Sequence, residues 1–233
     1  DKSLKVAFRN FIFKNFASHT LFLGNNMITG QNGYAFSKAI DFEWISKVLL
    51  QSAEEITTYF KKKEIAIHLV SFKDFYEDCA LELKKFRFKE IYEFKTQPNM
   101  ILYLNPNWKS MQDYLDALSK KYRDQYKRAL KKRNGIQVKN LSFVEVIQHE
   151  STINHLYHYV AKNAPFNTFF LAENHFSTLK GQCGNRFQIF GYFLNAKLVG
   201  FHTLLLNDAT LETYFLGYDA TVQKENMLYL NML

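Results

Sequence analysis

The feature that most constrains the fold is a run of apolar stretches at residues 187–220, separated by two short polar turns. The run reads FQIFGYFLNAKLVGFHTLLLNDATLETYFLGYDA, with turns expected at Asn195-Ala196 and Asn207-Asp208. Stretches rich in β-branched and aromatic residues with turns this short are typical of antiparallel hairpins. The run therefore predicts a three-strand β-meander, and the apolar stretch after it predicts a helix that begins near Lys224.

Upstream of the meander, the chain alternates between helical and extended patterns. Only 9 Gly and 3 Pro occur, which indicates long regular elements joined by short connections. Asp41 is an expected helix cap, and Trp44, Val48, Ala53, Ile56 and Phe60 recur at helical spacing after it. We predict helices over residues 41–64, 74–86, 110–134, 143–164 and 169–183. We predict strands over 19–36 (two, around a Gly/Asn loop), 65–72 (largely buried), 88–94, 99–105 and 136–143.

The predicted helix over 110–134 is the most basic part of the chain. Between Lys109 and Arg133 there are nine Lys or Arg residues and three Asp, a net charge of +6 out of +8 for the whole chain. Ser110 is its expected N-cap and Asn134-Gly135 its stop. Charge of this density attracts polyanions such as nucleic acid, acidic lipid or a phosphate-bearing cofactor, although a solvated helix face has the same composition.

Helical spacing divides this segment into an apolar stripe and a charged ridge. The stripe contains Met111, Leu115, Leu118, Tyr122, Tyr126 and Ala129, and Lys121, Arg128 and Lys132 flank it. Cations that flank a buried stripe are better placed to line a cleft than cations on the ridge top. Arg binds phosphate in a planar, bidentate manner, which favours Arg123 and Arg128 as phosphate contacts.

Candidate proton-handling residues occur in the meander. Glu212 and Tyr214 project from one face of a predicted strand, and an acid beside a phenol can accept and donate protons. His202 lies on the neighbouring strand and shares their face in one of the possible registers. The strand end at Leu216, Gly217 and Tyr218 feeds a helix and could present free N–H groups to a phosphate or carbonyl oxygen. An ordinary strand-to-helix connection and a solvent-facing strand remain open alternatives.

Other function classes have little support in the residues. Cys79 and Cys183 stand alone, and His155 and His158 have no third ligand at metal spacing, so we expect neither a disulfide framework nor a metal site. The sequence contains no GxSxG, P-loop or GxGxxG motif. No apolar run reaches 18 residues and no signal peptide is recognisable, so we expect a cytoplasmic protein. The missing initial Met and the uncapped final helix suggest a fragment.

Two segments carry a resemblance to a known family. NWKSMQDYLDALSKKYRDQYKRALKKRNGIQV, followed by two helices and the meander, resembles the FemAB-like branch of the acyl-CoA N-acyltransferase (GNAT) superfamily. The segments LGNNMITGQNGYAF and PNMILYLN resemble members associated with peptidoglycan biosynthesis. The helix positions that match are Lys121, Arg123 and Arg128, and the matching strand end runs from Leu216 to Asp219. The glycine-rich pyrophosphate loop of that superfamily is absent from YDATVQKENM.

The resemblance implies an α/β (α+β) fold of two GNAT-like halves with mixed, mostly antiparallel sheets flanked by helices. The halves would be residues 1–105 and 106–233, the second incomplete at its C-terminus. The implied donor is acyl-CoA, acyl carrier protein or aminoacyl-tRNA, with Lys121, Arg123, Arg128, Leu216, Gly217 and Tyr218 as binding residues. The acceptor would be an amine on a small molecule, lipid or cell-wall precursor.

We therefore hypothesise an N-acyltransferase in which an amine attacks a thioester or ester carbonyl directly. Glu212 or His202 would accept the amine proton, with Tyr214 as a further candidate, and strand N–H groups at 216–218 would polarise the carbonyl. The alternatives are a non-catalytic nucleic-acid-binding protein that uses residues 118–135 and a protein that docks on acidic membrane surfaces. Exposed aromatics among the cations would favour RNA, but Tyr122 and Tyr126 are expected on the apolar face.

Overall fold

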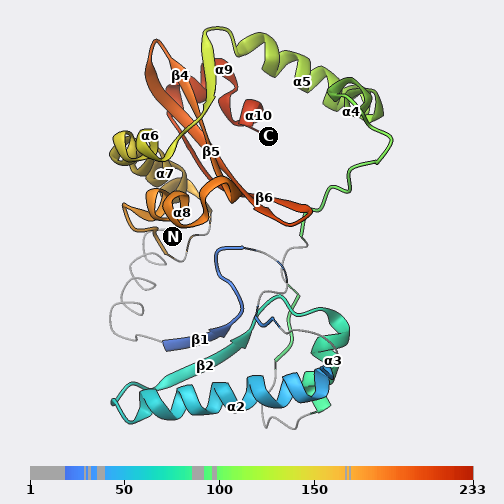
Figure 1. The fold of residues 1–233 in the computed structure, drawn as a ribbon, viewed down its shortest axis with the longest axis vertical. Helices are drawn as coiled ribbons and strands as arrows, with labels where there is room; N and C mark the ends of the chain where they lie inside the picture. The colour runs from blue at the N-terminus through green and yellow to red at the C-terminus, as the bar shows by residue number, and fades with distance from the viewer. Residues whose placement is uncertain are drawn as a thin grey trace, which may run out of the picture. The chain divides into compact units, whose positions relative to one another are not determined.

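The structure is a computed structural model of the 233-residue chain. It describes residues 19–28, 30, 33–35, 40–85, 92–95, 99–165, 167 and 169–232. The chain divides into two compact units, residues 1–102 and 103–233 (Figure 1).

The first unit has two parallel strands and two helices. Strands β1 (His19–Leu23) and β2 (Ile67–Phe72) pair in parallel, and helices α2 (Phe42–Lys61) and α3 (Glu77–Lys85) accompany them. Asp41 caps α2 as predicted, because its side chain accepts a hydrogen bond from the Glu43 N–H at 3.2 Å. A parallel pair needs a long crossover, which α2 provides.

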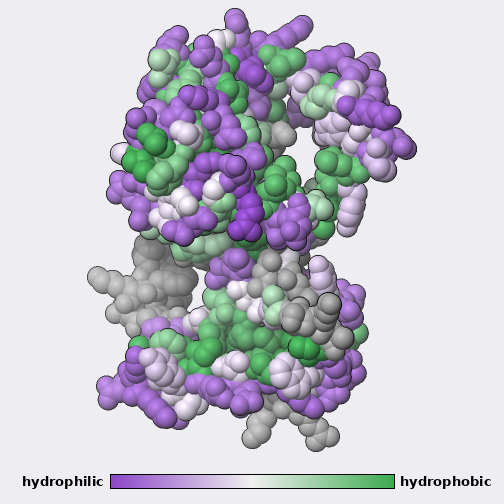
Figure 2. All heavy atoms as spheres, in the orientation of Figure 1, coloured by the Kyte–Doolittle hydropathy of each residue, from purple (hydrophilic) through white to green (hydrophobic). Residues whose placement is uncertain are grey.

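One prediction for the first unit, the largely buried strand, is wrong, and the apolar spacing of α2 does not mark its buried face. Helix α2 buries Ile45, Ser46, Leu49 and Ala53, whereas Trp44, Val48 and Ile56 are exposed. Two apolar stripes run along this helix, and spacing alone does not say which one is buried. Strand β2 is not a buried strand, since Leu69 is 57% exposed. Figure 2 shows hydrophobic side chains at the surface over this strand pair.

The predicted strands at 88–94 and 99–105 are not found where the structure describes the chain. Residues 92–95 and 99–105 form no strand, and residues 88–91 lie outside the described part. The same is true of the second short strand predicted in 19–36. Residues 33–35 do not form a strand, and residue 36 is not described. Helix α3 begins at Glu77 rather than at Asp74, whose φ of 60° is not helical.

The second unit is built on a four-strand antiparallel sheet in the order β3-β4-β5-β6. Its strands are β3 (Ile136–Asn140), β4 (Phe187–Leu194), β5 (Lys197–Asn207) and β6 (Thr210–Tyr218). The predicted meander is therefore confirmed, with the second turn one residue later because Asn207 pairs with Thr210. Asn195 and Ala196 have φ values of 50° and 61°, the backbone that a two-residue hairpin turn requires.

Helices cover both faces of this sheet (Figure 1). One face packs against α6 (Phe143–Gln148), α7 (Glu150–Asn163) and α8 (His175–Cys183), with a core that includes Tyr157, Phe176 and Phe201. The other packs against α9 (Ala220–Asn226) and α10 (Leu228–Met232), with a smaller core that includes Tyr192 and Leu228. We call these the α7 face and the α10 face.

The basic segment forms two helices instead of one. Helix α4 (Met111–Ala117) begins at Ser110, whose capping box with Asp113 confirms the predicted cap. Leu118 and Ser119 are extended, and α5 (Lys120–Lys132) follows. The Arg123 guanidinium Nη1 donates to the Asp116 carbonyl oxygen at 3.0 Å, which satisfies one of the last carbonyls of α4. The chain turns away at Gly135, where φ is 78°.

None of the described helices has the length and apolar character needed to cross a bilayer. Likewise, no group of three or more His, Cys, Asp or Glu side chains among the described residues is arranged to hold a metal ion.

Candidate active site at the end of strand β6

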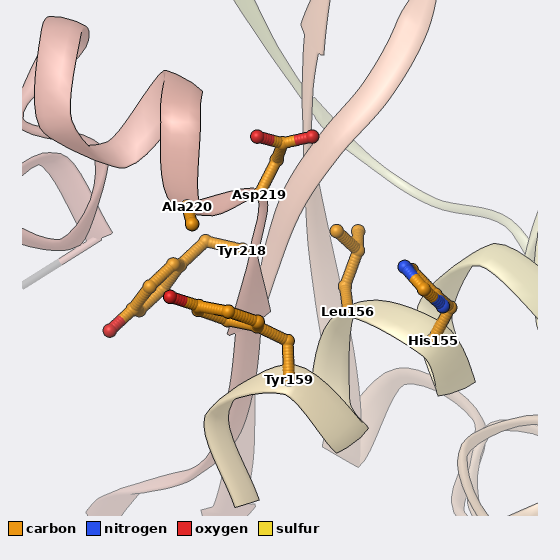
Figure 3. Close-up of a pocket in the computed structure, with 6 residues that line it drawn as sticks. All are labelled: His155, Leu156, Tyr159, Tyr218, Asp219 and Ala220. Carbon is orange, nitrogen blue, oxygen red and sulfur yellow. The ribbon is translucent and has the colours of Figure 1, made fainter. Parts of the chain in front are cut away.

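Strand β6 lies at one edge of the described sheet, and its end forms the candidate site. A hollow of about 190 Å³ opens here, and its walls come from α7, the last residue of β6 and the start of α9. Figure 3 shows Tyr159 of α7 and Tyr218 of β6 with their rings close together, 6.0 Å between centroids. The residues that line it are His155, Leu156, Tyr159, Tyr218, Asp219 and Ala220.

Gly217 explains why α7 can lie so close to this strand end. A Cβ at position 217 would fall 2.5 Å from the backbone C of Leu156 and 2.5 Å from the backbone N of Tyr157. No real side chain tolerates a backbone atom at that distance, so the glycine permits the contact of helix and strand. The glycine that was predicted to bind a cofactor therefore has a packing function that the sequence did not reveal.

A β-bulge interrupts the pairing of β5 and β6 just before the hollow. His202 pairs with Leu216 and Leu204 with Thr213, so that Tyr214 and Phe215 together lie opposite Thr203. The Thr203 hydroxyl donates to the Phe215 carbonyl oxygen at 2.6 Å and holds the irregular backbone in place. Bulges are common at sheet edges and beside active sites, where they redirect side chains.

Beyond the bulge, alternate N–H groups of β6 point away from β5. The Asp219 N–H donates to the Val199 carbonyl at 2.8 Å, which fixes the phase of the antiparallel ladder. By alternation, Gly217 also donates toward β5, whereas the N–H groups of Leu216 and Tyr218 point to the free edge. Two of the three predicted strand-end residues therefore present backbone donors to that edge.

The register separates the predicted proton-handling residues. Glu212 pairs with Leu205, which packs in the α7-face core, and Tyr214 packs in the same core. His202 instead stacks on Phe190 of the α10 face, with 5.0 Å between ring centroids. Glu212 and Tyr214 therefore share a face as expected, and His202 lies on the opposite one. The catalytic roles of all three stay predictions.

Burial changes the titration of these groups. It raises the pKa of Glu212 above its usual value, which makes the carboxylate a better proton acceptor. Burial, with a smaller contribution from Tyr157, raises the pKa of Tyr214 to about 12. Burial lowers the pKa of His202 to about 4, so His202 is neutral at pH 7. A carboxylate on the same face would have raised the pKa of this histidine, but Glu212 lies on the other face.

A second, more open hollow of about 610 Å³ lies between the end of α5 and α9. Lys132 and Lys224 give it two cations, Glu225 gives one anion, and Ala220 lines both hollows. Lys132 was among the cations expected to flank the apolar stripe of the basic helix. The three predicted phosphate contacts, Lys121, Arg123 and Arg128, do not line either hollow.

The surroundings of those three cations differ from the prediction. Arg123 is held by the Asp116 carbonyl, as described above. The Lys121 ammonium lies over the Tyr122 ring, 5.5 Å from its centroid, and Tyr122 is 53% exposed rather than buried in the stripe. Arg128 is exposed, whereas Ala129 is buried against α10. Figure 2 shows hydrophilic side chains over much of α4 and α5.

Several residues near the site were not predicted as functional. His155 was considered only as a metal ligand, and Tyr159 carried no signal because its partner Tyr218 is far away in sequence. His175 is hydrogen-bonded to Tyr214 across 39 positions, with 3.1 Å between its Nε2 and the hydroxyl. Pairings over such separations are set by the tertiary fold, so no local spacing could have revealed them.

Comparisons with known proteins give distant matches only. No protein-family model and no curated protein matches the chain. An aminoglycoside acetyltransferase from an uncultured soil metagenomic sample, solved with sisomicin, matches with a TM-score of 0.28 and 20% identity. That match covers 42% of this chain and 68% of the acetyltransferase, and the trehalose complex has a TM-score of 0.27.

A second match is the C-terminal domain of a proposed lysylphosphatidylglycerol synthetase from Agrobacterium fabrum. Its TM-score is 0.34 at 11% identity, and the match covers 51% of this chain but only 39% of that chain. The chain thus has a distant structural similarity to one solved acetyltransferase and to this synthetase domain. A specific similarity to FemAB-like enzymes, and an arrangement of two GNAT-like halves, are not among these findings.

Proposed function

We propose that this protein is an N-acyltransferase whose reacting centre lies along the free edge of β6. The observation that carries the proposal is the end of this strand. A bulge at Tyr214 and Phe215 precedes two edge-facing N–H groups, and a hollow opens directly after them. Edge-facing N–H groups that are fixed in advance stabilise the oxyanion formed when an amine attacks a thioester or ester carbonyl.

The charges around the strand end fit a phosphate-bearing donor. Lys132 and Lys224 line the open hollow beside the start of α9, within reach of an anionic group that enters from the side of α5. Lysine binds phosphate as a point charge. The donor would be acyl-CoA, acyl carrier protein or aminoacyl-tRNA, because all three carry phosphate. The acceptor would be an amine on a small molecule, lipid or cell-wall precursor.

In the proposed reaction, Glu212 accepts a proton from the attacking amine. Its carboxylate is partly buried on the α7 face, and within the described residues it has neither an ion-pair nor a hydrogen-bond partner. A desolvated carboxylate with a raised pKa is a stronger base than an exposed one. The N–H groups of Leu216 and Tyr218 polarise the carbonyl.

A transfer assay with each of the three donors and a panel of amines tests this function. We expect product with at least one donor, and a loss of about 10²-fold in kcat for Glu212→Gln. Glu54→Gln, a change at an exposed residue of α2, is the matched control and should keep the parent rate. Lys132→Ala with Lys224→Ala should raise KM for the donor, whereas Lys61→Ala with Lys62→Ala should not. Absence of product with every donor, in a folded protein, contradicts the proposal.

One observation favours a second function, the binding of single-stranded RNA. The exposed Tyr122 ring beside Lys121 on α5 is the arrangement of an aromatic among cations that binds stacked bases. Fluorescence anisotropy with a labelled single-stranded RNA tests it. We expect Tyr122→Ala to weaken binding about 10-fold or more, and Arg128→Ala to flatten its salt dependence. If both variants bind RNA as the parent does, or the parent does not bind, this function is excluded.

A further inference from the structure

Two asparagines from the far end of the chain hold the C-terminal end of helix α5. The side-chain amide of Asn226, the last residue of α9, donates to the Lys132 carbonyl oxygen at 2.9 Å. The side-chain amide of Asn231, in α10, donates to the Ala129 carbonyl oxygen at 3.1 Å. The last four carbonyls of a helix have no partner within it, so these two bonds satisfy groups that α5 itself leaves unpaired.

The two bonds differ in what they hold. Ala129 is buried where α10 packs against α5, so the Asn231 bond adds to an apolar contact that already fixes this turn. Lys132 is exposed and is the last residue of α5, the position at which a helix frays most readily. The Asn226 bond is therefore the hydrogen bond that ties the end of α5 to α9.

The Asn226 bond also brings two cations to one hollow. Lys224 lies two residues before Asn226 in α9, and Lys132 and Lys224 line the same open hollow of about 610 Å³. Glu225 lines it too, but among the described residues it forms no ion pair with either lysine. Two ammonium groups that face one space repel each other, and an anion between them offsets that repulsion. The hollow therefore suits an anion only while the two helices stay together.

We propose that Asn226 is a positioning residue for the anionic group of the donor and that it acts through Lys132, an inference that rests on the acyl transfer proposed above. By holding the Lys132 carbonyl, Asn226 keeps the last turn of α5 from fraying and fixes the base of the lysine side chain beside the hollow. The lysine then loses less conformational freedom when it binds the anion. Asn226 itself contacts no part of the donor and takes no part in the transfer of the acyl group.

Binding of inorganic pyrophosphate, measured by isothermal titration calorimetry, tests the inference without acyl transfer. The titration is done at low ionic strength, because salt screens exposed cations. We expect Lys132→Ala to weaken binding about 10-fold, as the loss of one charged hydrogen bond does. Asn226→Ala should weaken it about 3- to 10-fold, because a residue that acts through Lys132 costs no more than Lys132 itself. Asn226→Gln, which keeps the amide donor, should recover part of the affinity.

A double-mutant cycle separates positioning from a purely structural role. Lys132→Ala removes the ammonium group but keeps the carbonyl to which Asn226 donates. In that background, Asn226→Ala should leave the pyrophosphate affinity unchanged, yet it should lower the free energy of unfolding as much as it does in the parent. In the transfer assay, Asn226→Ala alone should raise KM for the donor and leave kcat unchanged.

Asn163→Ala is the matched control. The Asn163 side-chain amide donates to the Tyr159 carbonyl of α7 at 2.7 Å, so it too satisfies a carbonyl near the end of a helix, but Asn163 does not line the hollow. This variant should lower stability without changing the pyrophosphate affinity.

A parent protein that does not bind pyrophosphate, a folded Asn226→Ala variant with the parent affinity, or additive losses of affinity in the double variant each overturn the positioning role and leave the acyl transfer standing. Non-additive losses of affinity in a protein that transfers no acyl group from any donor support the role of Asn226 toward an anion and overturn the proposed function alone.

Discussion

Two tyrosine–histidine pairs occupy opposite faces of the same sheet, and they differ in what else each tyrosine contacts. On the α10 face, the Tyr192 hydroxyl lies 3.1 Å from Nδ1 of His202 and donates to the Asn231 carbonyl at 3.0 Å. On the α7 face, the Tyr214 hydroxyl has His175 alone among the described residues. The first hydroxyl is fully used inside the protein, and the second is not.

This difference separates a structural pair from one that is available for chemistry. Because a phenol carries a single proton and Tyr192 gives it to Asn231, His202 must be the donor to Tyr192. The network thereby ties α10 to strands β4 and β5. Asn231 extends it, since its side-chain amide donates to the Ala129 carbonyl of α5 at 3.1 Å. The catalytic role predicted for His202 stays a prediction, and its contacts in the structure tie α10 to the sheet.

The largest expected effect on stability comes from substituting a glycine, and it compares Gly217 on the α7 face with Gly200 on the α10 face. At Gly217 a Cβ would meet backbone atoms of α7, whereas at Gly200 it would meet the flexible side-chain ends of Met232 at 2.6 Å and Leu228 at 2.8 Å. We expect Gly217→Ala to lower the free energy of unfolding by about 3 kcal/mol and Gly200→Ala by about 1 kcal/mol. Urea denaturation measures both. Equal losses would mean that the two faces are packed with equal rigidity.

Removal of the Tyr192 or the Tyr214 hydroxyl should lower stability less than Gly217→Ala does, and the two losses should again differ. Tyr192→Phe leaves His202 Nδ1 and the Asn231 carbonyl without their partner, so we expect a loss of about 2 kcal/mol in the free energy of unfolding. Tyr214→Phe breaks one partly buried hydrogen bond, for which we expect about 1 kcal/mol or less. Thermal and urea unfolding of the two variants decide this. A larger loss for Tyr214→Phe would show that this pair too is mainly structural.

The sequence predicted the elements of the sheet well and the faces of its strands poorly. The first turn of the meander and the caps at Asp41 and Ser110 depend on a few neighbouring residues and are confirmed, whereas the second turn lies one residue later than predicted. The bulge at Tyr214 depends on Thr203, which lies on another strand and bonds to the Phe215 carbonyl. Strict alternation along β6 therefore could not show which side chains share a face after that point.

The candidate site, like the sheet, was predictable from sequence only in part. The end of β6 and its expected N–H groups follow from local sequence, and two of the three predicted residues present donors to the free edge. The positions of the cations could not be predicted in the same way. The basic segment breaks at Leu118 and Ser119, and the register of its apolar stripe changes there. Tyr122 is exposed for that reason, and Lys132, not Arg123 or Arg128, lines a hollow.

The smallest expected effect concerns pH and compares the two histidines directly. Burial lowers the pKa of His202 to about 4 from its ordinary value of 6.5, and it also lowers that of His175. In both cases the unfolded chain holds the proton more tightly than the folded chain. Stability is therefore complete above pH 6.5 and falls as the pH drops from 6.5 towards 4. Because both rings are only partly buried, we expect His202 to account for about 1 kcal/mol of this loss.

Urea unfolding of the parent, His202→Phe and His175→Phe between pH 7 and pH 5 measures the contribution of each ring. The window stops at pH 5 because carboxylates begin to titrate below it. In the His202→Phe variant, Tyr192 keeps its bond to Asn231, so the change removes the titration without leaving that hydroxyl unpaired. We expect His202→Phe to flatten the pH dependence of stability more than His175→Phe does. The reason is that a protonated imidazole is less favourable at His202, on the closed α10 face, than at His175, on the α7 face. The opposite order would mean that His202 has access to water, and the contrast between a closed and an open pair would then fail.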